Sequence, residues 1–165
     1  FSTFALGELP ESAKAVLILS MITGGSVGST AGGIKLLRLL VVLRVLQWLI
    51  ARTRLPAHAV SGPTLGGERL EQAELLPAAA VILLFLGVLT ASWLAFLAYG
   101  YEPLDALFEV TSATGTVGLS VGISRPELEP FLKGVLCLDM LLGRLEVFAV
   151  LVALSPRTWI GRRRS

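Results

Sequence analysis

The stretch Thr111-Ser112-Ala113-Thr114-Gly115-Thr116-Val117-Gly118-Leu119-Ser120 decides how this chain folds. It is polar and rich in glycine, and it lies between a short amphipathic run at residues 104–110 and a long apolar run that begins near Phe131. Non-helical backbone at membrane depth is tolerated only where it is buried in protein or lines a water-filled path. The stretch therefore predicts a re-entrant turn inside a membrane protein.

The same stretch has the composition of an ion filter. Thr116-Val117-Gly118 matches the start of the carbonyl-lined filter sequence of potassium channels, and glycine lets carbonyls turn toward an ion without a Cβ clash. We expect residues 105–113 to form a pore helix descending from the outer face, with Pro103 near its first turn. The return loop would present the backbone carbonyls of Thr116, Val117 and Gly118 to a dehydrated cation, with Leu119 completing the filter. The alternative is a polar turn between two helices at the membrane surface, and the apolar flanks, which are too short to span, favour the filter.

Composition points to a membrane protein. Of the 165 residues, 54% are hydrophobic and 16% are charged, whereas soluble domains carry roughly 25% charged residues. The net charge of +2 is too small to suggest a nucleic-acid partner. The single cysteine, Cys137, excludes an intrachain disulfide, and its apolar surroundings predict a buried thiol.

The apolar runs and the basic residues together predict a topology. Residues 75–99 form one clean span and residues 131–154 form another. Basic residues concentrate around the polar connector at residues 52–74 and at the C-terminus, so both are predicted to be cytoplasmic. The regions at residues 1–12 and 100–130 then face outward, and their acidic side chains would concentrate cations there.

An internal repeat supports this layout. An offset of roughly 119 positions pairs Lys14 with Lys133 and Gly24 with Gly143, along with several apolar matches. Transporters are often built from such repeats. The pattern predicts that the chain begins at the tail of one filter loop and then contains a complete second unit of helix, re-entrant loop and helix.

A second motif interrupts the first apolar segment. It combines glycines with hydroxyl residues and ends at Lys35; its members with a predicted role are Gly24, Gly25, Ser26, Gly28, Ser29, Thr30, Gly32 and Gly33. Each glycine costs about 1 kcal/mol of helix propensity relative to alanine. A phosphate-binding loop is excluded because the Gly-Lys-Ser/Thr ending is missing. A close-packed face of small residues remains the alternative, but the glycine density favours an unwound, movable segment beneath the filter.

The third motif places ionisable residues in the last apolar run, where they are costly and usually face the bundle interior or an aqueous path. Asp139, Arg144 and Glu146 are its members. Arg144 retains its charge at neutral pH. It could act as a gating charge or form a buried ion pair with Glu146, Asp139, Glu109 or another helix, and the two roles are compatible.

Taken together, the segments GGSVGSTAGGIK, ATGTVGLS and MLLGRLEVF resemble the C-terminal part of the membrane subunit of the Trk/Ktr potassium transporter family. The resemblance runs from Phe1 to about Trp159 and implies four pseudo-repeats of helix, pore loop and helix around one pore. It implies that residues 1–51 hold the end of the third filter loop and a broken exit helix with the gate loop. Residues 52–74 would be the connector, residues 75–156 the complete fourth repeat, and residues 157–165 a basic cytoplasmic tail. It further implies that Gly118 is the fourth filter glycine and that Arg144, with Lys35 as a second charge, acts electrostatically near the gate.

The resulting prediction is an all-α integral membrane fragment of a potassium-uptake subunit in a prokaryotic inner membrane. It would catalyse no covalent chemistry, bind no covalent cofactor, and carry K⁺, with Na⁺ left open. The resemblance implies a homodimer and a cytosolic nucleotide-binding regulatory ring, besides membrane lipid and the remaining repeats of the same protein. The rivals are another broken-helix secondary transporter, coupled to sodium or specific for an organic substrate, and a membrane enzyme or non-transporting assembly subunit.

Overall fold

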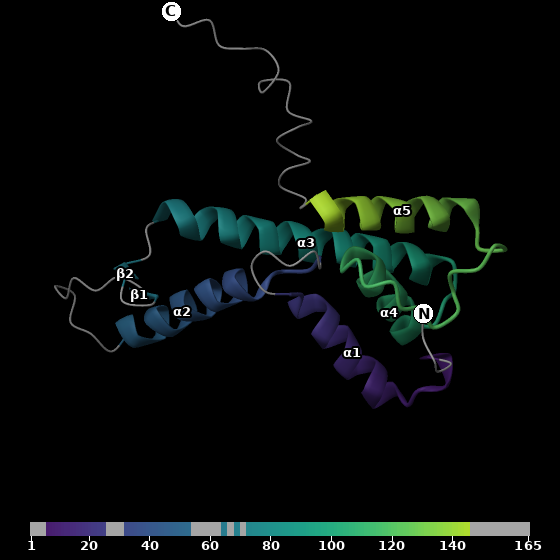
Figure 1. The fold of residues 1–165 in the computed structure, drawn as a ribbon, viewed down its shortest axis with the longest axis horizontal. Coiled ribbons are helices and arrows are strands. Elements are labelled where there is room, and N and C mark those ends of the chain that lie inside the picture. The colour runs from purple at the N-terminus through teal and green to yellow at the C-terminus, as the bar shows by residue number, and fades with distance from the viewer. Residues whose placement is uncertain (1–5, 26–31, 54–63, 66–67, 70–71, 146–165) are drawn as a thin grey trace, which may run out of the picture.

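The computed structural model describes residues 6–25, 32–53, 64–65, 68–69 and 72–145. A short 3₁₀ turn, η1 (Leu6–Glu8), precedes the helices α1 (Glu11–Thr23) and α2 (Leu36–Arg52). Three further helices follow: α3 (Gln72–Ala98), α4 (Pro103–Thr114) and α5 (Pro130–Leu145). Figure 1 shows α2 beside the first half of α3, with α1, α4 and α5 gathered around its second half. The predicted all-α class is confirmed.

One helix among the described residues is long and apolar enough to cross a membrane. It is the Leu76–Ala98 part of α3, with a mean hydropathy of 2.4, and only 28% of its most apolar window is buried. A core helix of a soluble protein would be mostly buried, so the exposed apolar surface of α3 suits lipid or further protein. The predicted span at residues 75–99 is confirmed as a helix up to Ala98. Residues 131–145 of the second predicted span lie in α5, and residues 146–154 lie outside the described residues.

The short helix α4 lies at the centre of the packing. It contacts α1, α3 and α5, and Phe108 through Thr114 are all buried. A helix buried on every side is surrounded by protein, which a turn at the membrane surface would not be. Pro103 occupies the first turn of α4, as predicted, where its missing N–H costs no hydrogen bond.

The helices α1 and α5 share their place in the predicted repeat. They begin at Glu11 and Pro130, which the offset of about 119 also pairs, and both pack against α4. The prediction that the paired segments are both helical is confirmed. Their superposition stays a prediction.

The glycine-rich motif breaks the first apolar segment as expected. The helix α1 ends at Thr23 and α2 begins at Leu36. Gly24 and Gly33 have φ angles of 68° and 91°, a region that glycine adopts far more readily than other residues. A Cβ on Gly24 would also lie 2.6 Å from the carbonyl oxygen of Gly32, so the two ends of the break approach each other through bare backbone.

Two features differ from or add to the sequence-based expectations. The connector contains a two-residue ladder, in which β1 (Thr64–Leu65) pairs antiparallel with β2 (Glu68–Arg69). The expectation of a buried thiol is wrong, because Cys137 is exposed on α5. The buried residues of α5, Leu132, Leu136 and Asp139, recur at helical spacing, and Cys137 lies off that face.

Candidate functional site

The filter loop leaves α4 in an unusual backbone conformation. Gly115 has a φ of −75°, while Thr116 and Gly118 have φ angles of 53° and 83°. A positive φ is uncommon for a residue other than glycine, and it marks a constrained site. Val117 lies between these two residues without a positive φ, so the sign of φ alternates along the three predicted filter residues.

The backbone N–H groups of this loop point back toward the helix that it leaves. Gly115, Thr116 and Val117 donate hydrogen bonds to the carbonyls of Thr111, Ala113 and Ser112 at 2.8, 3.0 and 2.9 Å. Within the described part of the chain, no backbone hydrogen bond ends on the carbonyl of Thr116, Val117 or Gly118. The N–H groups of residues 115–117 are therefore occupied, whereas no backbone donor among the described residues reaches the three carbonyls.

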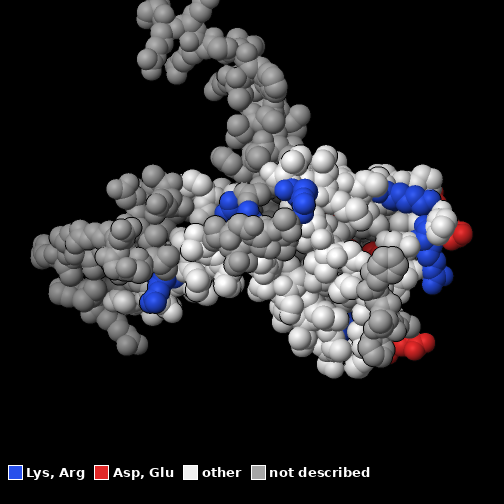
Figure 2. Space-filling view, viewed as in Figure 1, with Lys and Arg blue, Asp and Glu red and all other residues white. Residues whose placement is uncertain are grey.

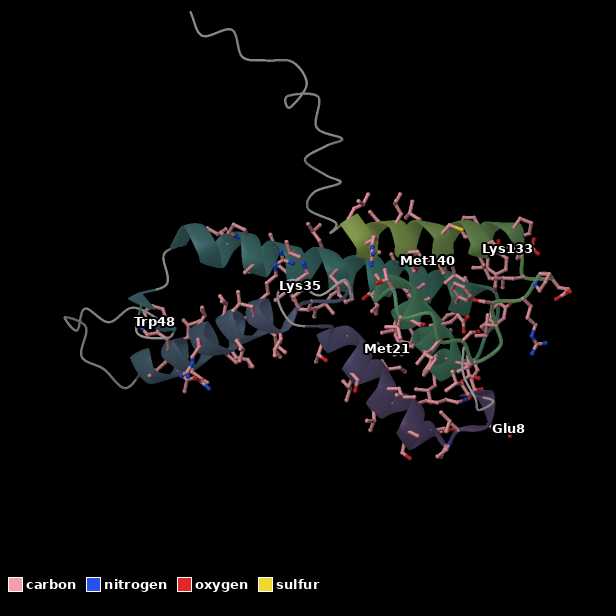
Figure 3. All side chains as sticks on the ribbon, viewed as in Figure 1. Glu8, Met21, Lys35, Trp48, Lys133 and Met140 are labelled. Atoms are coloured by element: carbon pink, nitrogen blue, oxygen red, sulfur yellow. The ribbon has the colours of Figure 1, made fainter. Side chains whose placement is uncertain are left out.

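A cavity of about 470 Å³ lies against the loop. Its lining combines predicted filter residues with side chains from α4, the following loop and α5: Glu109, Ser112, Ala113, Thr116, Gly118, Leu119, Ser120, Ser124, Met140 and Arg144. The structure thus brings Arg144, in the last turn of α5, to the same cavity as the filter loop. Figure 3 shows Met140 on α5 above α4, and Lys35 at the start of α2.

The gate-loop motif touches the filter loop directly. The N–H of Gly32 donates to the carbonyl oxygen of Gly115 at 3.1 Å and to the hydroxyl oxygen of Thr116 at 3.0 Å. A Cβ on Gly32 would lie 2.9 Å from that same carbonyl oxygen. Only a glycine permits this approach, which gives Gly32 a role in packing that its sequence position alone did not show.

The remaining residues of the motif divide into two groups. Gly24, Gly25 and Gly33 are described and lie outside helix, and the carbonyl of Gly25 accepts a hydrogen bond from the N–H of Leu36 at 3.1 Å. Ser26, Gly28, Ser29 and Thr30 lie outside the described residues. Lys35 precedes α2 with a φ of 62°.

A further glycine lets α5 approach the end of α4. A Cβ on Gly143 would overlap the carbonyl oxygen of Thr114, the last residue of α4. Close backbone contact through small residues is a common way for helices to associate in membranes. The C-terminal end of α4 therefore touches bare backbone from both Gly32 and Gly143.

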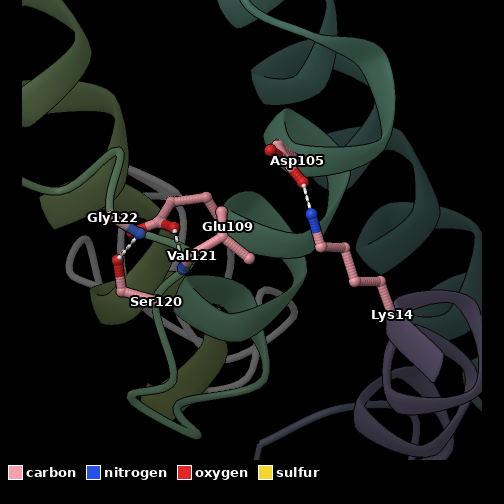
Figure 4. A network of polar contacts seen from close by, with 6 residues as sticks. All are labelled: Lys14, Asp105, Glu109, Ser120, Val121 and Gly122. Atoms are coloured by element: carbon pink, nitrogen blue, oxygen red, sulfur yellow. Dashed lines mark hydrogen bonds and ion pairs between the residues drawn. The ribbon is translucent and has the colours of Figure 1, made fainter. Parts of the chain in front are cut away.

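Polar side chains hold α4 at two other points, which Figure 4 shows together. Lys14 of α1 reaches Asp105 in the first turn of α4, with 2.6 Å between Nζ and Oδ1. Glu109, 3% exposed in the middle of α4, accepts hydrogen bonds from Val121 and Ser124 in the loop after the filter. Sequence reasoning considered Glu109 only as a partner for Arg144, although a glutamate between Phe108 and Val110 in a short apolar helix signals a buried polar partner.

Asp139 is likewise placed by the fold rather than by its sequence neighbours. It is completely buried, and its Oδ1 accepts a hydrogen bond from the hydroxyl of Ser92 on α3 at 2.7 Å. The contact joins α3 to α5 between two apolar surfaces.

Charged side chains are unevenly distributed over the surface. In the face drawn in Figure 2, most acidic side chains gather at the end where α3 finishes and α5 begins. Glu8, Glu127 and Glu129 are exposed residues of the loops and turns at this end. Basic side chains lie at this end too, and a largely uncharged surface separates this mixed cluster from the basic side chains of α2.

Comparison with known proteins agrees with this arrangement. A family model described as TrkH, cation transport protein, matches residues 1–159. An uncharacterized cation transporter of Methanocaldococcus jannaschii is 32% identical over 92% of this chain and 32% of its own length. The Trk system potassium uptake protein TrkH of Escherichia coli is 30% identical over 96% of this chain and 33% of its own length.

A solved structure shows the same fold. The crystal structure of the potassium transporter TrkH from Vibrio parahaemolyticus has a TM-score of 0.80 and 29% identity, and the match covers 96% of this chain and 34% of that one. The chain spans about a third of the length of these relatives. With the family model matching nearly its whole length, the chain belongs to the TrkH family of cation transport proteins.

Proposed function

We propose that this chain forms part of the pathway for potassium uptake across a prokaryotic inner membrane. The observation that carries the proposal is the alternation of φ at Thr116, Val117 and Gly118. In an extended strand, successive peptide groups face opposite ways, whereas alternating the sign of φ turns successive carbonyls toward one side. Carbonyls on one side can replace the hydration shell of a cation.

The hydrogen bonds support the same function. The N–H groups of residues 115–117 are turned away into α4, which leaves the carbonyl side for the ion. The pore would need three further loops from the rest of the protein, because one loop contributes only part of a carbonyl ring. The transported ion is K⁺, and Na⁺ is the competitor that the test below measures. The activity is transport rather than covalent catalysis.

We assign the barrier below the filter to the gate loop at residues 24–33. Its support is the contact between the N–H of Gly32 and the filter-loop atoms of Gly115 and Thr116. Arg144 would repel a cation in the closed state, since it lines the same cavity as the filter residues and repulsion in a water-poor cavity is little screened. Lys35, at the end of the gate loop, would add a second positive charge.

We propose that residues 1–51, 52–74, 75–156 and 157–165 are the four segments expected from the sequence, with the connector and the C-terminus in the cytoplasm. The exposed apolar residues of α2, α3 and α5 support contacts with lipid and with the remaining repeats. The assembly would be a homodimer, regulated by a cytosolic nucleotide-binding ring.

Two glycines with matching backbone conformation provide the test. Gly118 and Gly100 have left-handed φ angles of 83° and 82°, and a Cβ on either would meet nothing within 4 Å, but only Gly118 lies in the predicted filter. Alanine in this conformation costs about 1–2 kcal/mol, a factor of roughly 5–30 in an equilibrium. The complete protein is reconstituted in liposomes, and uptake of K⁺ and Na⁺ is measured per folded molecule.

We expect Gly118→Ala to lower the ratio of K⁺ to Na⁺ uptake, and Gly100→Ala, with the same backbone strain outside the filter, to leave it unchanged. An equal loss in both variants would mean that backbone strain in general, not filter geometry, sets the ratio. Selectivity unaffected by Gly118→Ala would contradict the assignment of the filter.

A further inference from the structure

In the loop that follows the filter, backbone N–H groups donate hydrogen bonds to side-chain oxygens rather than to the carbonyls of a helix or sheet. The N–H of Val121 donates to Oε2 of Glu109 at 3.2 Å, and the N–H of Ser124 donates to Oε1 of Glu109 at 3.2 Å. The hydroxyl of Ser124 donates to the same Oε1. Between them, the N–H of Gly122 donates to the hydroxyl of Ser120 at 3.0 Å. Backbone N–H groups outside helices and strands need other acceptors, and here one carboxylate supplies them for both Val121 and Ser124.

Glu109 is well placed to hold this loop in one position. It projects from the middle of α4, a helix buried between α1, α3 and α5, and is itself 3% exposed. Both of its oxygens act as acceptors, which is the hydrogen-bonding role of an ionised carboxylate, and such charge-assisted bonds are stronger than neutral ones. Figure 4 shows the side chain reaching from the helix to Val121. The loop is thus fastened to a rigid element.

The loop residues that donate hydrogen bonds to Glu109 follow the predicted filter in the sequence. Gly118, Leu119 and Ser120 line the cavity that Glu109 also lines, and Val121 follows directly. At the other end, the N–H groups of residues 115–117 fasten the loop to the last turn of the same helix. A binding geometry has to be held within about 0.5 Å to discriminate between similar ligands. The filter is therefore attached to α4 at both ends, through backbone at one and through Glu109 at the other.

We propose that Glu109 is a positioning residue for ion selectivity, which fixes the outer end of the filter by binding the N–H groups of Val121 and Ser124. The inference rests on the proposed filter function. Glu109 contacts no ion; it acts through the loop.

The test uses the complete protein reconstituted in liposomes, with Glu109→Ala, Glu109→Gln and Ser124→Ala compared with the parent. Glu102→Gln is the matched control, because it removes one negative charge from an exposed position at the N-terminal end of the same helix. For each variant, K⁺ and Na⁺ uptake are measured as functions of concentration, alongside membrane abundance and the thermal midpoint.

Glu109→Ala should lower the ratio of K⁺ to Na⁺ uptake by about tenfold, the change produced by about 1.4 kcal/mol of lost discrimination. It should also raise the KM for K⁺ more than it lowers the maximal rate. Glu109→Gln should recover part of the ratio, because its amide oxygen still accepts a hydrogen bond while its amide nitrogen faces donors. Ser124→Ala, which removes one of three donors, should show a smaller loss of the same kind, and Glu102→Gln should show none.

Unchanged selectivity in Glu109→Ala at normal abundance would overturn the proposal, as would an equal change in Glu102→Gln. If Glu109→Ala fails to accumulate, Glu109→Gln and Ser124→Ala decide, and parental selectivity in both overturns it. A parent protein without K⁺-selective uptake would instead refute the filter function on which the inference rests. A selective parent whose selectivity is unchanged in these variants would refute the positioning role of Glu109 alone.

Discussion

Replacing Gly143 by alanine would place a methyl group where α5 touches the end of α4. The added Cβ would overlap the carbonyl oxygen of Thr114. Because the overlapping atom belongs to backbone, no side chain can rotate to relieve the contact, and α5 must shift away from α4. The residues that follow Thr114 form the predicted filter, so the shift should reach the ion-binding carbonyls.

The size of the effect follows from two opposing contributions. Forcing an extra carbon into a packed contact typically costs about 1–3 kcal/mol. Gly134 in the same helix is the matched control, since a Cβ there would meet nothing within 4 Å. Alanine at Gly134 should stabilise the helix by up to about 1 kcal/mol through helix propensity. Alanine at Gly143 gains the same propensity, so the two variants should differ in stability by the cost of the overlap alone, roughly 1–3 kcal/mol.

The complete protein is purified in detergent, and the thermal midpoint is measured for both variants and the parent. We expect Gly143→Ala to lower the midpoint and Gly134→Ala to hold or raise it. Uptake of K⁺ and Na⁺ in liposomes, normalised to folded protein, should show a lower ratio only for Gly143→Ala. Equal midpoints and equal ratios for the two variants would refute the close contact between α5 and the end of α4.

Three further predictions concern the contacts around α4. Gly32→Ala should push the gate loop away from the filter loop, because the new Cβ would lie 2.9 Å from a backbone carbonyl oxygen. The variant should therefore raise the cation leak of the closed state per folded molecule, and an unchanged leak would contradict a barrier at this position. Lys14→Met should destabilise the protein by roughly 1–3 kcal/mol, between the values for exposed and buried ion pairs. The side chains of Lys14 and Asp105 are 8% and 24% exposed, which places the pair between these two cases. A double-mutant cycle with Asp105→Leu that shows no coupling energy would refute the ion pair. Ser92→Ala should lower the thermal midpoint, because the loss of the hydroxyl donor to Asp139 costs roughly 1–3 kcal/mol of stability. Ser92→Thr keeps a hydroxyl and should keep the midpoint close to that of the parent. Equal midpoints for the two variants would argue against this hydrogen bond.

Local signals predicted the helices and the break between α1 and α2. Pro103 favours the first turn of a helix, and the glycine density at residues 24–33 disfavours helix, so both features act through neighbours in sequence. The non-helical turn after α4 was predicted in the same way, from the glycines and apolar flanks of residues 111–120, and its role as a filter stays a prediction. The preferences of neighbouring residues are enough to predict a feature that depends only on neighbouring residues.

The contacts that hold the site were missed because they join distant parts of the chain. Gly32 meets Gly115, and Lys14 meets Asp105, across 83 and 91 positions. Nothing in the sequence around Gly32 distinguishes it from the other glycines of its motif, because the reason for the glycine lies in α4. The exposure of Cys137 was missed for a related reason: in a mostly apolar segment, composition alone does not show which side packs against protein.

In the proposed function the filter loop supplies the ion-binding carbonyls, and other residues determine where those carbonyls lie. Between helices in lipid the hydrophobic driving force is weak, and association depends on close packing and hydrogen bonds. Around α4 both kinds of contact occur: bare backbone at Gly32 and Gly143, and polar bonds at Lys14 and Glu109. Gly32, Gly143 and Lys14 join α4 or its loop to other segments, and Glu109 joins α4 to the loop after the filter. Displacing any of these segments should therefore displace the filter. Selectivity in this family should therefore respond to substitutions on α1, α4 and α5 that never touch the ion.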